Sequence, residues 1–265
     1  MKISAVIPVL NAKNTVKRTI ESVLNQTYAN WQLILVDGGS TDGTIEIIKS
    51  YSDQRIGVYE DLDGSITSAV NKGIKFSKGD IIMPWLCADD YIDSNFFENT
   101  AHVYSNNLID LTYSSWNALN GDLLIKNRQP QKNWENNLSY GMPKIMSNSF
   151  IFKRTIFDEL GLLDESILYA NDYEFIRRCI KANKIPKMVK ETCYNYSIGG
   201  LSQTKLLPCL LEVSRIAITF GDSKFKTYCF LFYKWFIVKC SFIINSWRQR
   251  KRSKKITSIR PSNES

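Results

Sequence analysis

The first 105 residues repeat one pattern, in which an apolar run of strand length is followed by a polar turn and then by apolar residues at helical spacing. The apolar runs cover residues 3–8, 31–36, 56–59 and 81–86. Helical patterns follow at 15–24, in a segment that ends near residue 51, and at 65–76. Such alternation predicts an α/β fold with a mostly parallel sheet and helices on both of its faces.

The alternation stops after residue 105. Residues 111–116 and 123–126 are strand-like and flank Asn120 and Gly121, a favourable hairpin turn. Residues 148–153 are another strand candidate, and apolar residues return at helical spacing from Asp172 onward. We therefore expect a second, less regular half built from a hairpin, a strand and a helix.

The formal charge of +8 is concentrated at one end of the chain. Of the 34 Lys and Arg residues, 11 lie in residues 224–265, where Glu264 is the only acidic residue.

The six cysteines show neither C-x-x-C pairing nor metal-ligand spacing, which favours a reducing, cytoplasmic setting. His102 is the only histidine and lies on a predicted helix, so we assign it a structural role and expect no His-based nucleophilic catalysis.

Candidate site carboxylates follow two of the predicted strands, and one more lies at the start of a predicted helix. Asp89 and Asp90 come after the apolar run 81–86, where carboxyl ends of strands form the ligand crevice of open α/β sheets and a paired Asp can hold a divalent cation. A solvated turn before a helix cap is the alternative for an isolated pair. Asp37 begins the turn DGGSTDG, which has neither the dinucleotide-binding nor the P-loop pattern. Asp172 lies in the first turn of its helix, where capping is the structural alternative.

The C-terminal part is aromatic and basic. Residues 228–247 are mostly apolar but are interrupted by Lys234 and Lys239, and on a helical projection they leave a broad apolar face. Basic residues at 248–255 follow, which suits an anionic membrane surface, so residues 206–250 are predicted to form a helical membrane-associating segment and 251–265 a basic disordered tail. Nucleic-acid binding is the weaker alternative, and we expect none; a core helix with a disordered basic end is the other alternative.

Several stretches together resemble the family 2 inverting glycosyltransferases, in the branch that builds O-antigen, capsular or colanic-acid-type polysaccharides. The matching stretches, in order, are IPVLNA, SVLNQTY, LILVDGGSTDGT, DLDGSITSAVNKGI, GDIIMPWLCADDY and GLLDESILYANDYEFIRR. The resemblance implies a GT-A fold, a Rossmann-like mixed, mostly parallel sheet, over residues 1–205. Residues 1–105 would form the nucleotide-sugar-binding half and 106–205 the acceptor-binding half.

The resemblance also implies roles for individual residues. Asp172 would be the catalytic base, and Asp90 would bind Mn²⁺ or Mg²⁺ on the donor diphosphate. The implied nucleotide-sugar-binding residues are Pro8, Asn11, Asp37, Gly38, Asn71 and Asp89. Gly199 to Ser202 resemble a turn that closes over the donor, with an ordinary Gly-Gly loop as the alternative. Arg177 and Arg178 are interpreted as a solvated helix face, with contact to an acceptor phosphate as the alternative.

The chain departs from the family pattern at several positions. Gly38 stands where a second Asp is frequent, and Ser68 where an Asp commonly precedes the Ala of the NKG segment. Cys87 replaces the first residue of the acidic triplet, Asn171 stands where Glu is common, and Leu10 replaces a frequent aromatic residue. These changes leave two functions open: an active enzyme, or a catalytically impaired nucleotide-sugar-binding or membrane-scaffold protein.

The function implied by the resemblance is metal-dependent, inverting transfer of a single hexose from a nucleotide-sugar onto a polyprenyl-diphosphate-linked saccharide, and we expect the donor to be a UDP-sugar. Together with the basic tail, it predicts a cytoplasmic, peripheral protein on the inner face of the cytoplasmic membrane, with residues 228–255 as the contact to the lipid surface. The sequence leaves open which sugar is transferred and to which position.

Overall fold

The computed structural model describes residues 1–62, 64–138, 145–199 and 205–236. The elements in chain order are β1 (Ile3–Val9), α1 (Val16–Leu24), β2 (Trp31–Asp37), α2 (Thr44–Lys49), β3 (Ile56–Glu60), α3 (Ile66–Phe76), β4 (Ile81–Met83), β5 (Tyr91–Ile92), α4 (Phe96–Val103), β6 (Leu111–Asn120), β7 (Leu123–Arg128), the 3₁₀ turns η1 (Trp134–Asn137) and η2 (Ser147–Ser149), β8 (Ile151–Lys153), α5 (Arg154–Leu160), α6 (Asn171–Lys181), β9 (Pro186–Ser197) and α8 (Leu206–Thr219). A last described helix covers residues 224–236.

Nine strands of the described residues form one mixed sheet, in the order β3-β2-β1-β4-β8-β6-β9-β5, with β7 paired to β6. β1 to β4 pair in parallel, as the alternation predicts, and β6 pairs in parallel with β9. β8 joins the two halves by antiparallel pairing to β4 and β6. Because most paired residues belong to parallel pairs, the predicted α/β architecture with a mostly parallel sheet is confirmed.

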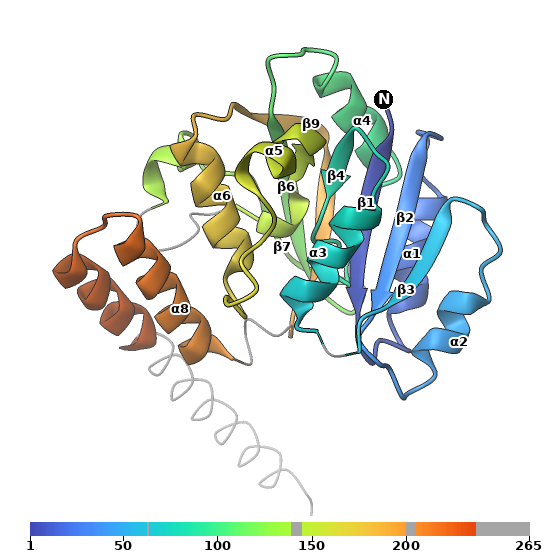
Figure 1. The fold of residues 1–265 in the computed structure, drawn as a ribbon, viewed down its shortest axis with the longest axis horizontal. Coiled ribbons are helices and arrows are strands. Elements are labelled where there is room, and N and C mark those ends of the chain that lie inside the picture. Colours follow the sequence, from blue (N-terminus) through green and yellow to red (C-terminus); the bar gives the residue numbers. More distant parts are fainter. Residues whose placement is uncertain (63, 139–144, 200–204, 237–265) are drawn as a thin grey trace, which may run out of the picture.

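Each face of the sheet carries its own hydrophobic core. Along β1, Ile3, Ala5 and Ile7 face the core shared with α1, α2 and α4, whereas Val6 faces the core shared with α3, α5 and α6. This alternation follows from the two-residue period of a strand, and it is why the central strands are apolar throughout. In Figure 1, α3, α5 and α6 lie in front of the sheet and α8 lies beside α6.

Two predicted strands are shorter than expected. The apolar run 81–86 forms a strand only to Met83, because Pro84 has no N–H to continue the ladder. The chain returns to β1 at Leu86, whose N–H donates to the Val6 carbonyl at 3.2 Å, so Asp89 and Asp90 lie on a turn beyond the strand rather than at its tip.

The strand predicted at 148–153 begins only at Ile151. The residues before it form η2, in which the Ser149 hydroxyl and N–H both donate to the Met146 carbonyl, at 2.8 and 3.1 Å. Such local side-chain bonds compete with a strand ladder, and here they replace its first residues. The predicted hairpin is confirmed, since β6 and β7 pair across Gly121, which has a φ of +59°.

No helix among the described residues is both long and apolar enough to cross a lipid bilayer. The basic cluster at 248–255 and the end of the predicted membrane-associating segment lie outside the described residues. The same holds for most of the turn predicted at Gly199 to Ser202.

Candidate active site

The parallel pairing of β1 and β2 brings Pro8, Asn11, Asp37 and Gly38 to one edge of the sheet. The Gly38 N–H donates to the Val9 carbonyl at 2.8 Å, which joins the two strand ends. Four of the six residues predicted to bind the nucleotide-sugar therefore lie together.

The carboxylate of Asp37 is used by its own turn. It is only 3% exposed, and it accepts from the N–H groups of Gly39 and Ser40 at 3.0 and 2.9 Å and from the Ser40 hydroxyl at 2.6 Å. Asn11, at a φ of +48°, accepts from the Thr41 N–H at 2.9 Å. In the structure both side chains shape the glycine-rich turn, and their contact with a donor stays a prediction.

Asp90 is fully buried and is held by β9. Its Oδ2 accepts from the Tyr194 hydroxyl at 2.6 Å and its Oδ1 from the Ser197 N–H at 2.8 Å, while Asn148 Nδ2 lies 3.4 Å from Oδ2. Burial, with the nearby charge of Asp89, raises the pKa of Asp90 to about 7. Ionising this buried carboxyl group is therefore costly unless a cation or hydrogen-bond donors compensate its charge.

Helix α1 braces the turn that carries the two carboxylates. The Thr19 hydroxyl donates to the Asp90 carbonyl at 2.7 Å, and Arg18 Nη2 donates to the Asp89 carbonyl at 3.3 Å and to the Ser197 hydroxyl at 3.1 Å. Burial raises the pKa of Asp89, an effect that the charge of Arg18 opposes. No sequence pattern predicts this contact, because α1 is remote from the turn along the chain.

The donor atoms of Cys87, Asp89 and Asp90 lie within 4.8 Å of one another. Carboxylate oxygens are the ligands that Mn²⁺ and Mg²⁺ prefer, so two of the three side chains fit such a cation. Burial, together with the three surrounding carboxylates, raises the pKa of the Cys87 thiol well above its usual value. Because Mn²⁺ and Mg²⁺ prefer oxygen ligands to sulfur, a cation here would be held by Asp89 and Asp90.

Asp172 lies in the first turn of α6, as predicted. Its Oδ2 accepts from the Ser147 hydroxyl and its Oδ1 from the Tyr173 N–H at 2.7 Å. Burial raises the pKa of Asp172, although both hydrogen bonds oppose the shift. The N-cap position of α6 is Ala170, so Asp172 is not the capping residue of its helix.

Two consecutive side chains of η2 connect the carboxylates. Ser147 donates to Asp172, and Asn148 Nδ2 contacts Cys87 Sγ at 3.2 Å as well as Asp90. The charge of Asp172 also acts on the Cys87 thiol. Asp90 and Asp172, which are far apart in sequence, therefore both contact η2, through adjacent residues. Sequence reasoning missed both η2 residues, whose signal is a short polar run directly before an apolar strand.

Asn71 is placed differently from the other predicted donor residues. Its side chain is 2% exposed and pairs with the backbone of Leu163, donating to its carbonyl at 2.9 Å and accepting from its N–H at 3.0 Å. It also donates to Glu165 at 3.0 Å. In the structure Asn71 ties α3 to the segment before α6, and any role toward the donor stays a prediction.

The interpretation of Arg177 and Arg178 as a solvated helix face is wrong. Arg177 forms an ion pair of 2.6 Å with Asp222, in which both side chains are nearly buried. Arg178 pairs with Glu174 and donates to the carbonyl of Leu160, the last residue of α5, and to that of Leu162 just beyond it. Both guanidinium groups hold helices together because long Arg side chains can reach partners on neighbouring elements.

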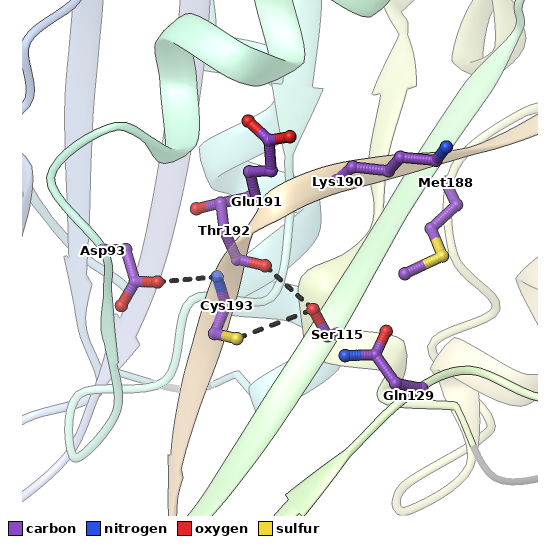
Figure 2. A pocket seen from close by; sticks show the side chains of 8 residues that line it. All are labelled: Asp93, Ser115, Gln129, Met188, Lys190, Glu191, Thr192 and Cys193. Atoms are coloured by element: carbon purple, nitrogen blue, oxygen red, sulfur yellow. Dashed lines mark hydrogen bonds between the residues drawn. The ribbon is translucent and has the colours of Figure 1, made fainter.

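A pocket of about 460 Å³ lies where β9 bulges away from β6. Figure 2 shows that its lining comes mainly from one stretch of β9, with Ser115 and Gln129 opposite. Glu191 has a φ of +59° at this bulge. The lining residues are Asp93, Ser115, Gln129, Met188, Lys190, Glu191, Thr192 and Cys193. None of them is a predicted site residue, so the pocket is separate from the site around Asp90 and Asp172.

Comparison with known proteins relates the chain to glycosyltransferases. A model described as "Glycosyl transferase family 2" matches residues 4–161. An uncharacterised glycosyltransferase of Rickettsia typhi is 28% identical over 192 residues, covering 69% of this chain and 60% of the relative. The Escherichia coli protein UDP-Glc:alpha-D-GlcNAc-diphosphoundecaprenol beta-1,3-glucosyltransferase WfgD is 29% identical over 178 residues, covering 66% of this chain and 65% of its own length. The chain thus spans less than two thirds of these relatives.

Two solved structures share the fold. Residues 1–349 of Staphylococcus aureus TarS, in complex with UDP-GlcNAc, superpose with a TM-score of 0.68 at 16% identity, over 87% of this chain and 70% of the other. The mannosyltransferase PcManGT from Pyrobaculum calidifontis, in complex with GDP-Man and Mn²⁺, gives a TM-score of 0.65 at 14% identity, over 87% of this chain and 69% of the other. The expected GT-A architecture is confirmed.

Proposed function

Because the chain belongs to glycosyl transferase family 2, we propose that it is an inverting enzyme that moves one sugar from a nucleotide-sugar onto a polyprenyl-diphosphate-linked saccharide. The reaction would serve the synthesis of a surface polysaccharide of the O-antigen or capsule kind. A single observation supports the proposal: Asp90 and Asp172 contact neighbouring side chains of η2.

The two carboxylates have separate tasks in this reaction. Asp172, whose pKa is raised by burial, accepts the proton of the acceptor hydroxyl as the hydroxyl oxygen attacks the anomeric carbon. The bond between that carbon and the diphosphate oxygen breaks on the opposite face, and the nucleoside diphosphate leaves. One displacement without a covalent intermediate inverts the anomeric centre.

The donor diphosphate would be held near Asp89 and Asp90, with Mn²⁺ or Mg²⁺ as the cation. When bound, such an ion neutralises charge on the leaving diphosphate. Asp90 is kept in place for this task by Tyr194 and Ser197, and the turn is kept in place by Arg18. Pro8, Asn11, Asp37 and Gly38 would line the base and ribose part of the donor site.

The names of relatives support the substrate classes. WfgD is named for a UDP-glucose donor and a diphosphoundecaprenol-linked acceptor, and the TarS structure holds UDP-GlcNAc. We therefore propose a UDP-sugar donor carrying a hexose and a lipid-diphosphate acceptor for this chain.

The end of the described chain supports a site of action at the inner face of the cytoplasmic membrane. Helix 224–236 exposes several aromatic side chains to solvent, among them Phe225 at 79%, Phe232 at 64% and Phe236 at 53%. In Figure 1 this helix lies beside α8, at the edge of the molecule away from β1 to β3. Exposed aromatics next to a basic sequence suit an anionic lipid surface, so we place the membrane-associating segment in residues 206–250, with the basic tail 251–265 beyond it.

An activity assay tests the proposal. The protein would be incubated with a panel of UDP-sugars, Mn²⁺ or Mg²⁺, and a lipid-diphosphate sugar acceptor, and the anomeric configuration of the product would be determined. We expect transfer with inversion, and loss of transfer in Asp90→Ala and in Asp172→Asn. Full turnover in both variants would overturn the assigned mechanism.

The departures from the family's acidic pattern favour one second candidate. With Ser68 and Cys87 in place of acids, the chain would bind a nucleotide-sugar without transferring it, as a scaffold at the membrane. Binding of UDP-sugars without transfer or hydrolysis, across a broad acceptor panel, would favour this alternative over the enzyme.

A further inference from the structure

Glu212 of α8 is a buried carboxylate, 8% exposed, whose two oxygens are taken up by backbone N–H groups. Oε1 accepts from Leu168 at 2.8 Å, and Oε2 accepts from Tyr169 at 2.7 Å and from Ala170 at 2.9 Å. Hydrogen bonds to an ionised carboxylate are shorter and stronger than those between neutral groups. Three such bonds fix three consecutive peptide units of the loop.

These peptide units lead directly into the catalytic helix. Ala170 is the N-cap of α6 and supplies no side-chain cap, and Asp172 is the second residue of the helix. The other side of the same entry is held by α3, where the Thr67 hydroxyl donates to the Ile167 carbonyl at 2.8 Å and accepts from Asn171 Nδ2 at 2.8 Å. The path of the chain into α6, and with it the direction of the Asp172 side chain, is thus set between α3 and α8.

We propose that Glu212 is a positioning residue for sugar transfer, which fixes the entry to α6 so that the Asp172 carboxylate faces the acceptor hydroxyl. The proposal rests on the proposed function, in which Asp172 is the base. It makes α8, the first helix of the proposed membrane-associating segment, part of the catalytic unit. The negative charge of Glu212 also raises the pKa of Asp172, although less than burial does.

The test compares the full-length protein with Glu212→Gln, Glu212→Asp and a control. Gln keeps the size of the side chain but places an amide donor against N–H donors, so at least one of the three bonds is lost. We expect kcat to fall by roughly 10- to 100-fold, because small misplacements of a catalytic group have effects of that size. The affinity for UDP should not change, and the acidic limb of the pH profile should move to lower pH. Glu212→Asp, which keeps the charge, should recover part of the lost rate.

Ile216→Ala is the matched control. Ile216 lies one turn further along α8, is 5% exposed, and packs into the same core. It should lower the melting temperature without moving the pH profile. An equal loss of kcat in Ile216→Ala and Glu212→Gln at matched stability, with no change of the pH profile in either, would reduce Glu212 to a structural residue and overturn the proposal.

Hydrogen exchange separates this proposal from the proposed function because it needs no turnover. In Glu212→Gln the amides of residues 168–170 should exchange faster, while those of β1 and β2 keep their wild-type rates. Unchanged exchange at 168–170 would overturn the role of Glu212 even in an active enzyme. A wild-type protein that shows this protection but transfers no sugar from any donor would instead overturn the proposed function, and with it the role of Glu212 in the reaction.

Discussion

The two carboxylates of the candidate site are held in different ways. Asp90 is fully buried and is bound from β9 by a tyrosine hydroxyl and a backbone N–H. Asp172 is partly exposed and is bound by one serine hydroxyl and the N–H of its own neighbour, Tyr173. Asp90, the proposed donor-side group, is therefore fixed by the sheet, whereas Asp172, the proposed base, depends on how the chain enters α6.

This contrast indicates which property each carboxylate controls. Changes around Asp90 should alter cation binding and stability, because its charge is buried without a cationic partner in direct contact among the described side chains. Changes around Asp172 should alter the rate of transfer and leave donor binding as it is. Substitutions at each carboxylate and at its hydrogen-bond partners should therefore separate cation binding from the rate of transfer.

Asp172→Asn should lower kcat by roughly 10²- to 10⁴-fold, the usual contribution of general acid–base catalysis. Asn keeps an oxygen that can accept from the Ser147 hydroxyl, so the fold and UDP binding should remain. Steady-state kinetics and calorimetric titration with UDP and Mn²⁺ would measure the two quantities. An unchanged kcat, or a loss of UDP affinity as large as the loss of kcat, would contradict the assignment of Asp172 to the base alone.

Asp90→Asn should weaken Mn²⁺-dependent binding of UDP-sugar by roughly tenfold or more, since one of two carboxylate ligands is lost.

The same variant should be more stable than the wild type at pH 8 without a cation. The reason is that the pKa of Asp90 is raised to about 7 in the folded state, so the unfolded chain releases this proton first. The contribution of Asp90 to the free energy of unfolding is fully present below about pH 4 and is lost as the pH rises through about 7. The total loss is on the order of a few kcal/mol.

Thermal unfolding at pH 5 and pH 8 would test this stability difference, with EDTA present to remove divalent cations. The gain of Asp90→Asn over the wild type should be larger at pH 8. If Asp90→Asn raised the stability by the same amount at pH 5 and at pH 8, the pKa of Asp90 would not be raised in the folded protein.

Cation affinity should rise with pH in the wild type. Protonated Asp90 is a poor ligand, so the apparent affinity for Mn²⁺ should increase as pH is raised through about 7 and level off above it. Electron paramagnetic resonance of free Mn²⁺ would give the affinity at each pH. The pH dependence should disappear in Asp90→Asn, and its persistence there would assign it to another group.

Tyr194→Phe should have a smaller effect, on the order of 1–3 kcal/mol in stability, because it removes one hydrogen bond to a buried carboxyl group. The lost bond is the 2.6 Å contact between the Tyr194 hydroxyl and Asp90 Oδ2. Since that donor favours the ionised form of Asp90, the pH midpoint of Mn²⁺ binding should move upward. A fall in stability without any shift of the midpoint would mean that the hydroxyl has only a packing role.

Asp222→Asn should leave donor binding and the pH profile unchanged while lowering stability by on the order of 2 kcal/mol. It breaks the nearly buried ion pair with Arg177, which lies at the far end of the contact between α6 and α8 from Glu212. Thermal unfolding and transfer kinetics would be compared in the same buffer. A shift in the pH profile as large as that of Glu212→Gln would mean that any weakening of the α6–α8 contact disturbs the base.

The strands and helices of the N-terminal half could be predicted from sequence because each follows from residues that are close together in the chain. The strands β1 to β3 follow from apolar runs, and the helices between them from spacing and turn residues, such as Ser65 at the start of α3. The resemblance to a family then assigned roles to Asp90 and Asp172, and the structure brings the two together. Pro84 shortened a predicted strand that the apolar pattern alone extended to residue 86.

The contacts that hold the site could not be predicted in this way. Tyr194 and Ser197 reach Asp90 across more than 100 residues of chain, and Glu212 reaches the entry to α6 across more than 40. No periodicity or motif in a single sequence records such pairs, since each depends on how the second half folds back on the first. The same reason explains why Arg177 was assigned to a solvated face.

A crystal structure of the protein with a UDP-sugar and Mn²⁺ tests most directly whether the two carboxylates share one reaction centre. We predict that the cation lies on Asp89 and Asp90 and that the anomeric carbon faces the Asp172 carboxylate on the side opposite the diphosphate. A cation bound elsewhere, or protein side chains between Asp172 and the anomeric carbon, would contradict the shared site.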